Sequence, residues 1–279
     1  MPSGHMYDFG KKAGLVLSLL GLGLGLESCG LVKKKSDTCN LKADGLTTSA
    51  YSGDTLSDKH ISLIFLKGPS EATPAIGTYL DSQSVHATFF VQGSLVKEHE
   101  SDIERLVEQG HQIGTGGFSF TALATAQDPV LELRTADALI TPFAHGNQYW
   151  LYGERGSLDK DALTQLQRAG LGKYVGPIHG DTTGAAFVSD DQCWEKGMTV
   201  ETCADGYFNE ITRIGHGLIP LHDTDEHTGE MLKVLVPELL AYGMTFVRLD
   251  QVPKLRLALT EVGGTPDASI GAAACNDYE

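Results

Sequence analysis

Short apolar runs alternate with amphipathic stretches along most of this chain, and that alternation limits the fold more than any other feature. Short apolar runs are typical of buried strands, whereas apolar residues at helical spacing are typical of surface helices. Their alternation implies parallel strands with helical crossovers, in either an open doubly wound sheet or a closed barrel. In both, functional side chains lie beyond the carboxyl ends of the strands. The predicted strands cover residues 61–66, 87–91, 174–178, 218–221 and 244–249, with another beginning at Ile113.

The stretches between the predicted strands are expected to form helices and connecting loops. Helices are predicted to begin near Thr73 and Ser157 and to cover residues 229–242, where Pro237 falls inside the helix. These elements predict one folded domain flanked by segments of different character. The expected divisions are a tag remnant with a signal or lipoprotein segment at 1–29, a linker at 30–56, the folded domain at 57–256 and a C-terminal tail at 257–279.

The first segment has the pattern of an export signal. Lys11 and Lys12 precede an apolar run at residues 13–26, which is too short and too rich in glycine to cross a membrane comfortably. The run ends in Leu-Glu-Ser before Cys29, which resembles a bacterial lipobox and would place a lipid on Cys29. We therefore expect an exported protein of the periplasm or cell envelope, which contacts the membrane only through this N-terminal lipid or signal.

Four cysteines remain besides Cys29, and an even number in an exported protein suggests two disulfides. Three pairings are open; Cys193 with Cys203 is the local choice, and Cys39 with Cys275 would then join the two ends of the domain. Spacing typical of a structural zinc site is absent from the sequence. The formal net charge of −15 repels phosphates, so a nucleic acid is not an expected partner.

Several segments in the predicted domain carry a family resemblance. They are IFLKGP at 64–69, HATFFV at 86–91, QGHQIG at 109–114, GPI at 176–178, DQCW at 191–194, CADGY at 203–207, IPLHD at 219–223 and FVRLD at 246–250. In this order they resemble the motifs of the polysaccharide deacetylases, the NodB homology domain of carbohydrate esterase family four. The resemblance implies an α/β fold, a distorted (β/α) barrel with fewer than eight parallel strands.

The resemblance also implies a chemistry that this chain has largely replaced. In the family, an aspartate and two histidines bind a divalent metal, usually zinc, while a second aspartate is the base and a distant histidine the acid. The metal lowers the pKa of water, and the base must reach that water. The family positions align here with Leu66 for the base, Lys67 for the metal aspartate, Gly116 and Phe120 for the two histidines, Ile140 for an orienting arginine and Gly180 for a tryptophan. We therefore expect no zinc or other metal cofactor.

Two polar residues of the family set remain, and they are the candidate catalytic residues. They are Asp181 and His222, although without a metal His222 fits a structural role equally well. Lys67 would bring an ammonium group into the former metal pocket, and burial of that charge requires a partner. Asp181 or Asp223 is the expected partner of Lys67.

Three functions remain open. The first is an exported envelope protein that binds an N-acetylated glycan, peptidoglycan-like or chitin-like, or an envelope protein partner, without zinc-dependent deacetylase activity. The alternative is an active carbohydrate N-deacetylase with a non-standard site around Asp181, His222 and Asp223, within or near the polar run at 222–227. The third is a lipoprotein in which the fold is only a spacer. Metal analysis and acetate release separate the first two, and glycan pull-down separates the third.

Overall fold

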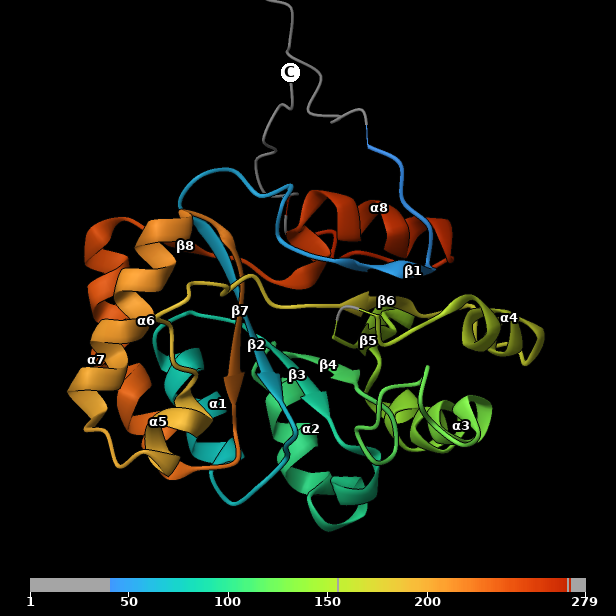
Figure 1. Ribbon diagram of the computed structural model, residues 1–279, viewed down its shortest axis with the longest axis horizontal. Coiled ribbons are helices and arrows are strands. Elements are labelled where there is room, and N and C mark those ends of the chain that lie inside the picture. The colour runs from blue at the N-terminus through green and yellow to red at the C-terminus, as the bar shows by residue number, and fades with distance from the viewer. Residues whose placement is uncertain (1–40, 155, 270, 272–279) are drawn as a thin grey trace, which may run out of the picture. The chain divides into compact units, whose positions relative to one another are not determined.

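The computed structural model describes residues 41–154, 156–269 and 271, and parallel strands form its centre (Figure 1). Seven strands follow the order β1-β6-β5-β4-β3-β2-β7, and β8 pairs with β2 beside this path. All of the strand pairs are parallel, which confirms the predicted sheet and the incomplete barrel. The strands are β1 Leu46–Tyr51, β2 His60–Leu66, β3 Thr88–Val91, β4 Gln112–Thr115, β5 Trp150–Tyr152, β6 Val175–Ile178, β7 Gly217–His222 and β8 Thr245–Phe246.

The helices between the strands cover the outer face of the sheet, whereas the last helix, which follows β8, packs with side chains of the opposite face (Figure 1). The α-helices are α1 Thr73–Ser82, α2 Glu100–Glu108, α3 Pro129–Ile140, α4 Lys160–Arg168, α5 Asp190–Glu195, α6 Val200–Ile214, α7 Glu226–Tyr242 and α8 Pro253–Glu261. Short 3-10 helices lie at η1 Gly93–Glu98, η2 Thr141–Phe143, η3 His145–Asn147 and η4 Leu249–Gln251.

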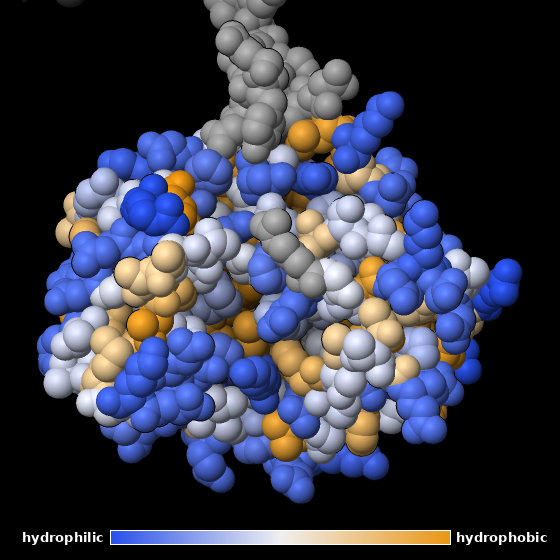
Figure 2. Space-filling view, in the orientation of Figure 1, coloured by the Kyte–Doolittle hydropathy of each residue, from blue (hydrophilic) through white to orange (hydrophobic). Residues whose placement is uncertain are grey.

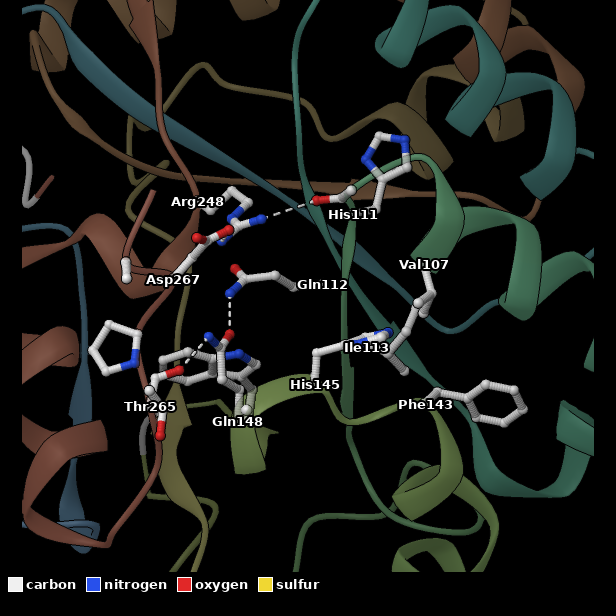
Figure 3. Close-up of a pocket in the computed structure, with 15 residues that line it drawn as sticks. Val107, His111, Gln112, Ile113, Phe143, His145, Gln148, Arg248, Thr265 and Asp267 are labelled. Atoms are coloured by element: carbon white, nitrogen blue, oxygen red, sulfur yellow. Dashed lines mark hydrogen bonds and ion pairs between the residues drawn. The ribbon is translucent and has the colours of Figure 1, made fainter. Parts of the chain in front are cut away.

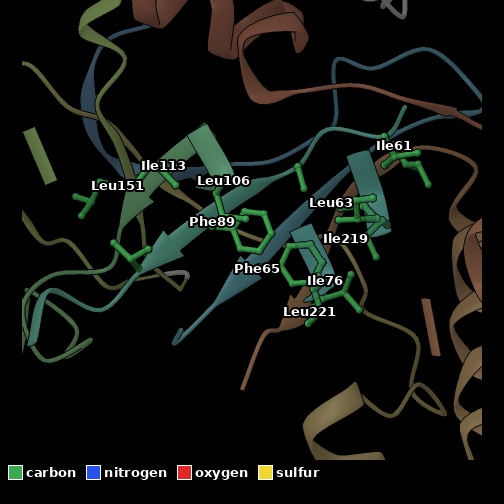
Figure 4. Close-up of a cluster of buried hydrophobic side chains, with 14 of the residues drawn as sticks. Ile61, Leu63, Phe65, Ile76, Phe89, Leu106, Ile113, Leu151, Ile219 and Leu221 are labelled. Atoms are coloured by element: carbon green, nitrogen blue, oxygen red, sulfur yellow. The ribbon is translucent and has the colours of Figure 1, made fainter. Parts of the chain in front are cut away.

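The two faces of the strands build two hydrophobic cores, because successive side chains of a strand point to opposite sides. In β2, Ile61, Leu63 and Phe65 join the outer core, where Phe65 stacks on Phe89 of β3 (Figure 4). Ile64 and Leu66 of the same strand join the inner core. The inner face of β2 therefore ends in Leu66, at the edge where the connecting loops begin.

The structure moves two of the predicted domain boundaries. The linker predicted at 30–56 contains β1, which pairs with β6, and α8 continues past the predicted boundary at 256. β1 was missed because its sequence LTTSAY has no apolar run; only its two end residues are buried. The helix expected at Ser157 instead begins after Asp159, whose side chain accepts a hydrogen bond from the amide of Ala162.

The predicted local disulfide is present: Cys193 and Cys203 are bonded, with their Cα atoms 6.0 Å apart. It joins α5 to α6. The predicted lipid site at Cys29 and the predicted pairing of Cys39 with Cys275 fall outside the described residues, as does the predicted signal segment. Within the described residues, none of the helices has the length and apolar character needed to span a bilayer.

Asp181 closes the gap between β1 and β7, the two ends of the strand path. Its Oδ2 accepts hydrogen bonds from the amides of Gly53, after β1, and of Leu218, in β7, at 2.7 and 2.8 Å. Gly53 and Gly217 meet backbone to backbone there, since a Cβ on Gly53 would lie 2.5 Å from the Cα of Gly217. A side chain therefore completes the barrel where strand pairing stops.

The end of β7 is tied to the start of α1 by a second buried aspartate. Asp223 accepts a hydrogen bond from the Thr73 hydroxyl at 2.6 Å, and its carboxylate fills the space that a side chain on Gly68 would need. Burial raises the pKa of Asp223 to about 6 from 3.8, against the opposing effects of Thr73, His222 and backbone amides. Its ionised form is thus held in the fold at a cost.

Replacing Asp181 tests the barrel closure. Asp181→Ala removes the oxygen shared by two amides, and each unsatisfied buried donor costs about 1–3 kcal/mol. We expect the free energy of unfolding in urea to fall by about 2–4 kcal/mol. Asp181→Asn retains an oxygen at this position and should lose less than about half as much. Equal losses in the two variants would show that the bridging oxygen does not hold the barrel closed.

Asp223 should give the fold a specific dependence on pH. Its folded pKa is raised, so its stabilising contribution is complete below its unfolded pKa of 3.8 and is lost as pH rises through about 6. Asp223→Asn does not titrate, so its stability relative to the unmodified protein should rise by about 3 kcal/mol between about pH 4 and pH 7. Urea denaturation across this range measures the difference, and a pH-independent difference would contradict the assignment.

Candidate functional site

A cavity of about 520 Å³ opens at the carboxyl ends of the strands. Residues from the ends of β2, β5 and β7 and from the loops after β4 and β6 line it, as expected for a parallel barrel. Figure 2 shows a hollow near the middle of the molecular face, with hydrophobic atoms at its bottom and hydrophilic atoms around it. The residues that line the cavity include Leu66, Lys67, Gly116, Phe120, Tyr152, Glu154, Asp191, Gln192 and His222.

The four residues that the family resemblance aligns with the base and metal-ligand positions all line this cavity. Leu66 is 3% exposed and belongs to the inner core, whereas Lys67 follows it with a backbone φ of 69°. The ring of Phe120 lies against Gly116: a Cβ built on Gly116 would be 2.7 Å from the ring. Phe120 thus occupies the space that any larger side chain at Gly116 would need.

His222 and Asp190 form a pair at the cavity that several hydrogen bonds hold in place. His222 ends β7, and its Nδ1 lies 2.8 Å from Oδ1 of Asp190, at the start of α5. The amide of His222 and the hydroxyls of Thr228 and Tyr207 also donate to Asp190, at 2.8, 2.8 and 3.1 Å. Both oxygens of this fully buried carboxylate are therefore occupied twice, and the imidazole is fixed with Nε2 toward the cavity side.

Asp191 lies on the other side of the imidazole and links it to Lys67. Its Oδ2 is 3.6 Å from Nε2 of His222 and 3.5 Å from Nζ of Lys67. Burial alone raises the pKa of Asp191, but the Ser189 hydroxyl, His222, Lys67 and the Gln192 amide together hold that pKa below its ordinary value. Asp190, His222, Asp191 and Lys67 thus form a chain of alternating charge type, which we call the acid–base chain.

The donors at this cavity match a zinc site poorly. Among the described residues, Asp190, Asp191 and His222 form a group whose ligand atoms lie within 4.8 Å of one another. The hydrogen bonds already made to Asp190 use both of its oxygens, and Nδ1 of His222 is bound to it. That leaves Nε2 of His222 and one oxygen of Asp191, beside the Lys67 ammonium, whereas catalytic zinc normally has three protein ligands.

The structure separates the other predicted site residues from the cavity. Asp181 lies at the barrel closure and Asp223 beneath Gly68, so the pairing predicted between Lys67 and one of these aspartates is wrong: Asp191 is its partner. Asp181 is unsuited to that role because two backbone amides already hold its oxygen. Asp223 is bound by Thr73. The non-standard catalytic site predicted around Asp181, His222 and Asp223 therefore does not form at the cavity, because only His222 of the three lines it.

The remaining predicted positions have packing roles. Ile140 is buried at the end of α3, and Gly180 packs on Pro220, which would be 2.6 Å from an added Cβ. Asp225 caps α7 through the amide of His227 at 2.8 Å. Sequence reasoning missed Asp190 and Asp191 as site residues, although this pair of acids, directly before and at the start of the DQCW segment, was the available signal.

A second cavity of about 430 Å³ lies at the opposite, amino ends of β4 and β5 (Figure 3). Its polar side chains bind one another: Arg248 pairs with Asp250 at 2.9 Å and with Asp267 at 3.2 Å, while Gln148 donates to the carbonyl of Thr265 at 2.9 Å. These contacts tie the segment after α8 to the barrel. We assign this region a structural role and place the functional site at the first cavity.

Comparison with known proteins agrees with this geometry. Residues 53–173 match the family model for polysaccharide deacetylase. The putative polysaccharide deacetylase YheN of Bacillus subtilis is 29% identical over 146 residues, which is 50% of this chain and 50% of YheN. The chain therefore spans about half the length of that relative.

Two solved structures share the fold. The Bc1960 peptidoglycan N-acetylglucosamine deacetylase superimposes with a TM-score of 0.58 at 22% identity, covering 74% of this chain and 92% of that structure. A family-four (CE4) pseudoenzyme from Bacillus anthracis superimposes with a TM-score of 0.56 at 18% identity, covering 71% of this chain and 66% of that structure. The match over residues 53–173 and the parallel half-barrel show that this chain is similar to the polysaccharide deacetylases and shares their fold.

Proposed function

We propose that this domain binds an N-acetylated glycan, such as peptidoglycan or a chitin-like chain, without zinc-dependent deacetylation. One observation carries the proposal: at the cavity, Lys67 pairs with Asp191 while the Phe120 ring fills the space beside Gly116. An ammonium and an aromatic ring thus stand where the family has its metal ligands. The names of similar proteins support both halves of the proposal, since one is a peptidoglycan deacetylase and another a pseudoenzyme.

The loss of zinc chemistry follows from charge and from the missing base. The Lys67 ammonium beside Asp191 opposes a divalent metal at the same carboxylate, since like charges at short range repel strongly. Leu66 cannot take a proton from water, since its side chain carries no ionisable group. Metal chemistry therefore loses its ligands and its proton acceptor together.

The cavity offers surfaces suited to a sugar ring. Tyr152 lies between Phe90 and Phe120, with ring centroids 5.6 Å from each. Aromatic rings of this kind present apolar faces to the C–H groups of a sugar, while polar side chains at the edge orient its hydroxyls. Here Gln192, Glu154 and the acid–base chain supply the polar edge. A volume of about 520 Å³ falls within the usual range for ligand pockets.

Export to the cell envelope is part of the same proposal. Peptidoglycan lies outside the cytoplasm, and the segment before Cys29 has the pattern of an export signal. A lipid on Cys29 would hold the domain near the membrane, where an envelope protein is the expected partner if the ligand is not a glycan.

A second candidate function keeps an enzymatic role, and the intact His222–Asp190 pair is the observation that favours it. A histidine whose Nδ1 is held by a buried carboxylate can exchange a proton through Nε2. The reaction would then be carbohydrate N-deacetylation without a bound metal. We rank it below glycan binding because a lysine ammonium at this cavity cannot activate water as a divalent metal ion does.

Metal content and turnover distinguish the two candidates. We expect the purified protein, dialysed against zinc and then against buffer, to retain far less than one equivalent of zinc by mass spectrometry. N-acetylchitotetraose should bind in calorimetry but release no acetate above a matched His222→Ala variant. Stoichiometric zinc, or acetate release that depends on His222, would overturn the proposal.

Reinstating the family residues gives a sharper test of why the chemistry is absent. The triple change Leu66→Asp, Lys67→Asp and Gly116→His should still bind zinc weakly, because a side chain at Gly116 would collide with Phe120. Adding Phe120→His should raise zinc affinity by roughly 100-fold or more, since it clears the space and adds an imidazole ligand. A mutant of the similar pseudoenzyme has restored enzymatic activity.

Zinc titration of the triple and quadruple variants measures this difference directly. Adding Phe120→Ala to the triple variant, in place of Phe120→His, separates steric relief from ligation, since alanine clears the space beside the new histidine without adding a ligand. Equal zinc affinity of the triple and quadruple variants would show that Phe120 does not block the site.

A further inference from the structure

We propose that Lys67 selects N-acetylated over free-amine sugars by donating a hydrogen bond to the acetyl carbonyl oxygen. This inference rests on the proposed glycan-binding function and assigns its specificity to one side chain. In the family the carbonyl oxygen is met by a metal; here the ammonium of Lys67 stands at the same strand end and supplies positive charge without a metal.

The geometry leaves Lys67 free to donate. An ammonium has three N–H donors, and Asp191, at 3.5 Å, is the partner that the described residues give it. The Lys67 side chain is 53% exposed and lines the cavity, so at least one donor is available to a ligand. The distance to Asp191 is long for a charged hydrogen bond, which means that a carbonyl oxygen can compete for that donor.

The backbone fixes where this ammonium is presented. Lys67 has a φ of 69°, a region that costs energy for a residue other than glycine. Leu66 on one side is held in the inner core, and Gly68 on the other lies directly over the Asp223 carboxylate. The lysine is therefore held at a set position at the edge of the cavity, although its long side chain is half-exposed.

The two halves of an acetyl group match adjacent residues of the chain. Leu66 presents an apolar surface for the methyl group, and Lys67 presents N–H donors for the oxygen; both line the cavity. Phe120 adds a second apolar wall beside Leu66. A free amine has neither a methyl group to bury nor an oxygen to accept a hydrogen bond.

Charge works in the same direction. A protonated sugar amine placed at the acetyl position would lie close to the Lys67 ammonium and would be repelled. The nearest carboxylate, Asp191, is already shared by Lys67 and His222, so it offers little compensating attraction. Glu154 is exposed at the cavity edge, where solvent screens its charge.

Binding of matched oligosaccharides to the full chain tests this inference. N-acetylchitotetraose and chitotetraose differ only in acetylation, and at about pH 6 the amines of the second are largely charged. We expect the unmodified protein to bind the acetylated chain roughly 10- to 100-fold more tightly, since a hydrogen bond from a charged donor is worth about 1.5–3 kcal/mol. Calorimetry or ligand-observed NMR measures both affinities.

Three variants assign the preference to the ammonium group. Lys67→Met keeps the length of the side chain but not its donors, and should lower affinity for the acetylated chain roughly 10-fold while leaving affinity for chitotetraose equal or higher. Lys67→Arg keeps charge and donors and should retain most of the preference. Lys97→Met removes an exposed lysine of η1 that does not line the cavity, and should change neither affinity.

The outcomes separate this inference from the function on which it rests. If neither oligosaccharide binds, glycan binding itself is wrong. If both bind and Lys67→Met keeps the preference for acetylated chains, glycan binding stands and the role of Lys67 is wrong. If chitotetraose binds more tightly than the acetylated chain, the cavity prefers free amines, and the inference is again overturned.

Discussion

The buried carboxylate of Asp190 is the contact on which the rest of the site depends. It accepts hydrogen bonds from the last residue of β7, from α6 and from α7, while itself beginning α5. A buried carboxylate is tolerated only when its oxygens are satisfied, and here four donors meet them. Removing any one of these elements would leave part of a buried charge unsatisfied, so strand, helices and imidazole are positioned as one unit. The disulfide between α5 and α6 supports the same arrangement.

Next to this unit, a lysine ammonium lies at the end of the strand where the family resemblance implies a metal. The family resemblance implies a metal among carboxylate and imidazole ligands; this chain instead has an ammonium beside Asp191, with one carboxylate on each side of His222. The local positive charge thus remains at the end of β2, but it is monovalent and mobile on a flexible side chain. Such a charge orients and attracts, yet it cannot activate water as a divalent ion does. This difference is why we assign the cavity to recognition.

Much of the fold could be predicted from the sequence, because apolar runs and helical spacing can be recognised without knowledge of the three-dimensional structure. The runs that became β2, β3, β6 and β7 were predicted within a residue or two. β1 and β5 were not, since an edge strand with two buried ends and a three-residue strand carry little periodic signal. Motif order compensated, and it gave the barrel that periodicity could not distinguish from an open sheet.

The site itself was predicted less completely. The residues that the resemblance assigns to the base and metal-ligand positions, Leu66, Lys67, Gly116 and Phe120, share the cavity. The partner of Lys67 was not predicted correctly. The loop after β6 and the start of α5 bring Asp191 to Lys67 from 124 positions away in the sequence. Such a contact depends on the path of a loop, which leaves no pattern in a single sequence. Asp181 was retained for closing the barrel, a role that residue type alone does not distinguish from catalysis.

The position of Phe120 limits the order in which substitutions could build a metal site at this cavity. With its ring against Gly116, a histidine introduced at that glycine alone would find its space occupied. Replacement of Phe120 must therefore precede or accompany any larger side chain at Gly116. Two coupled substitutions are needed where an open site would need one, so such a site cannot be reached from this chain by a single change at Gly116.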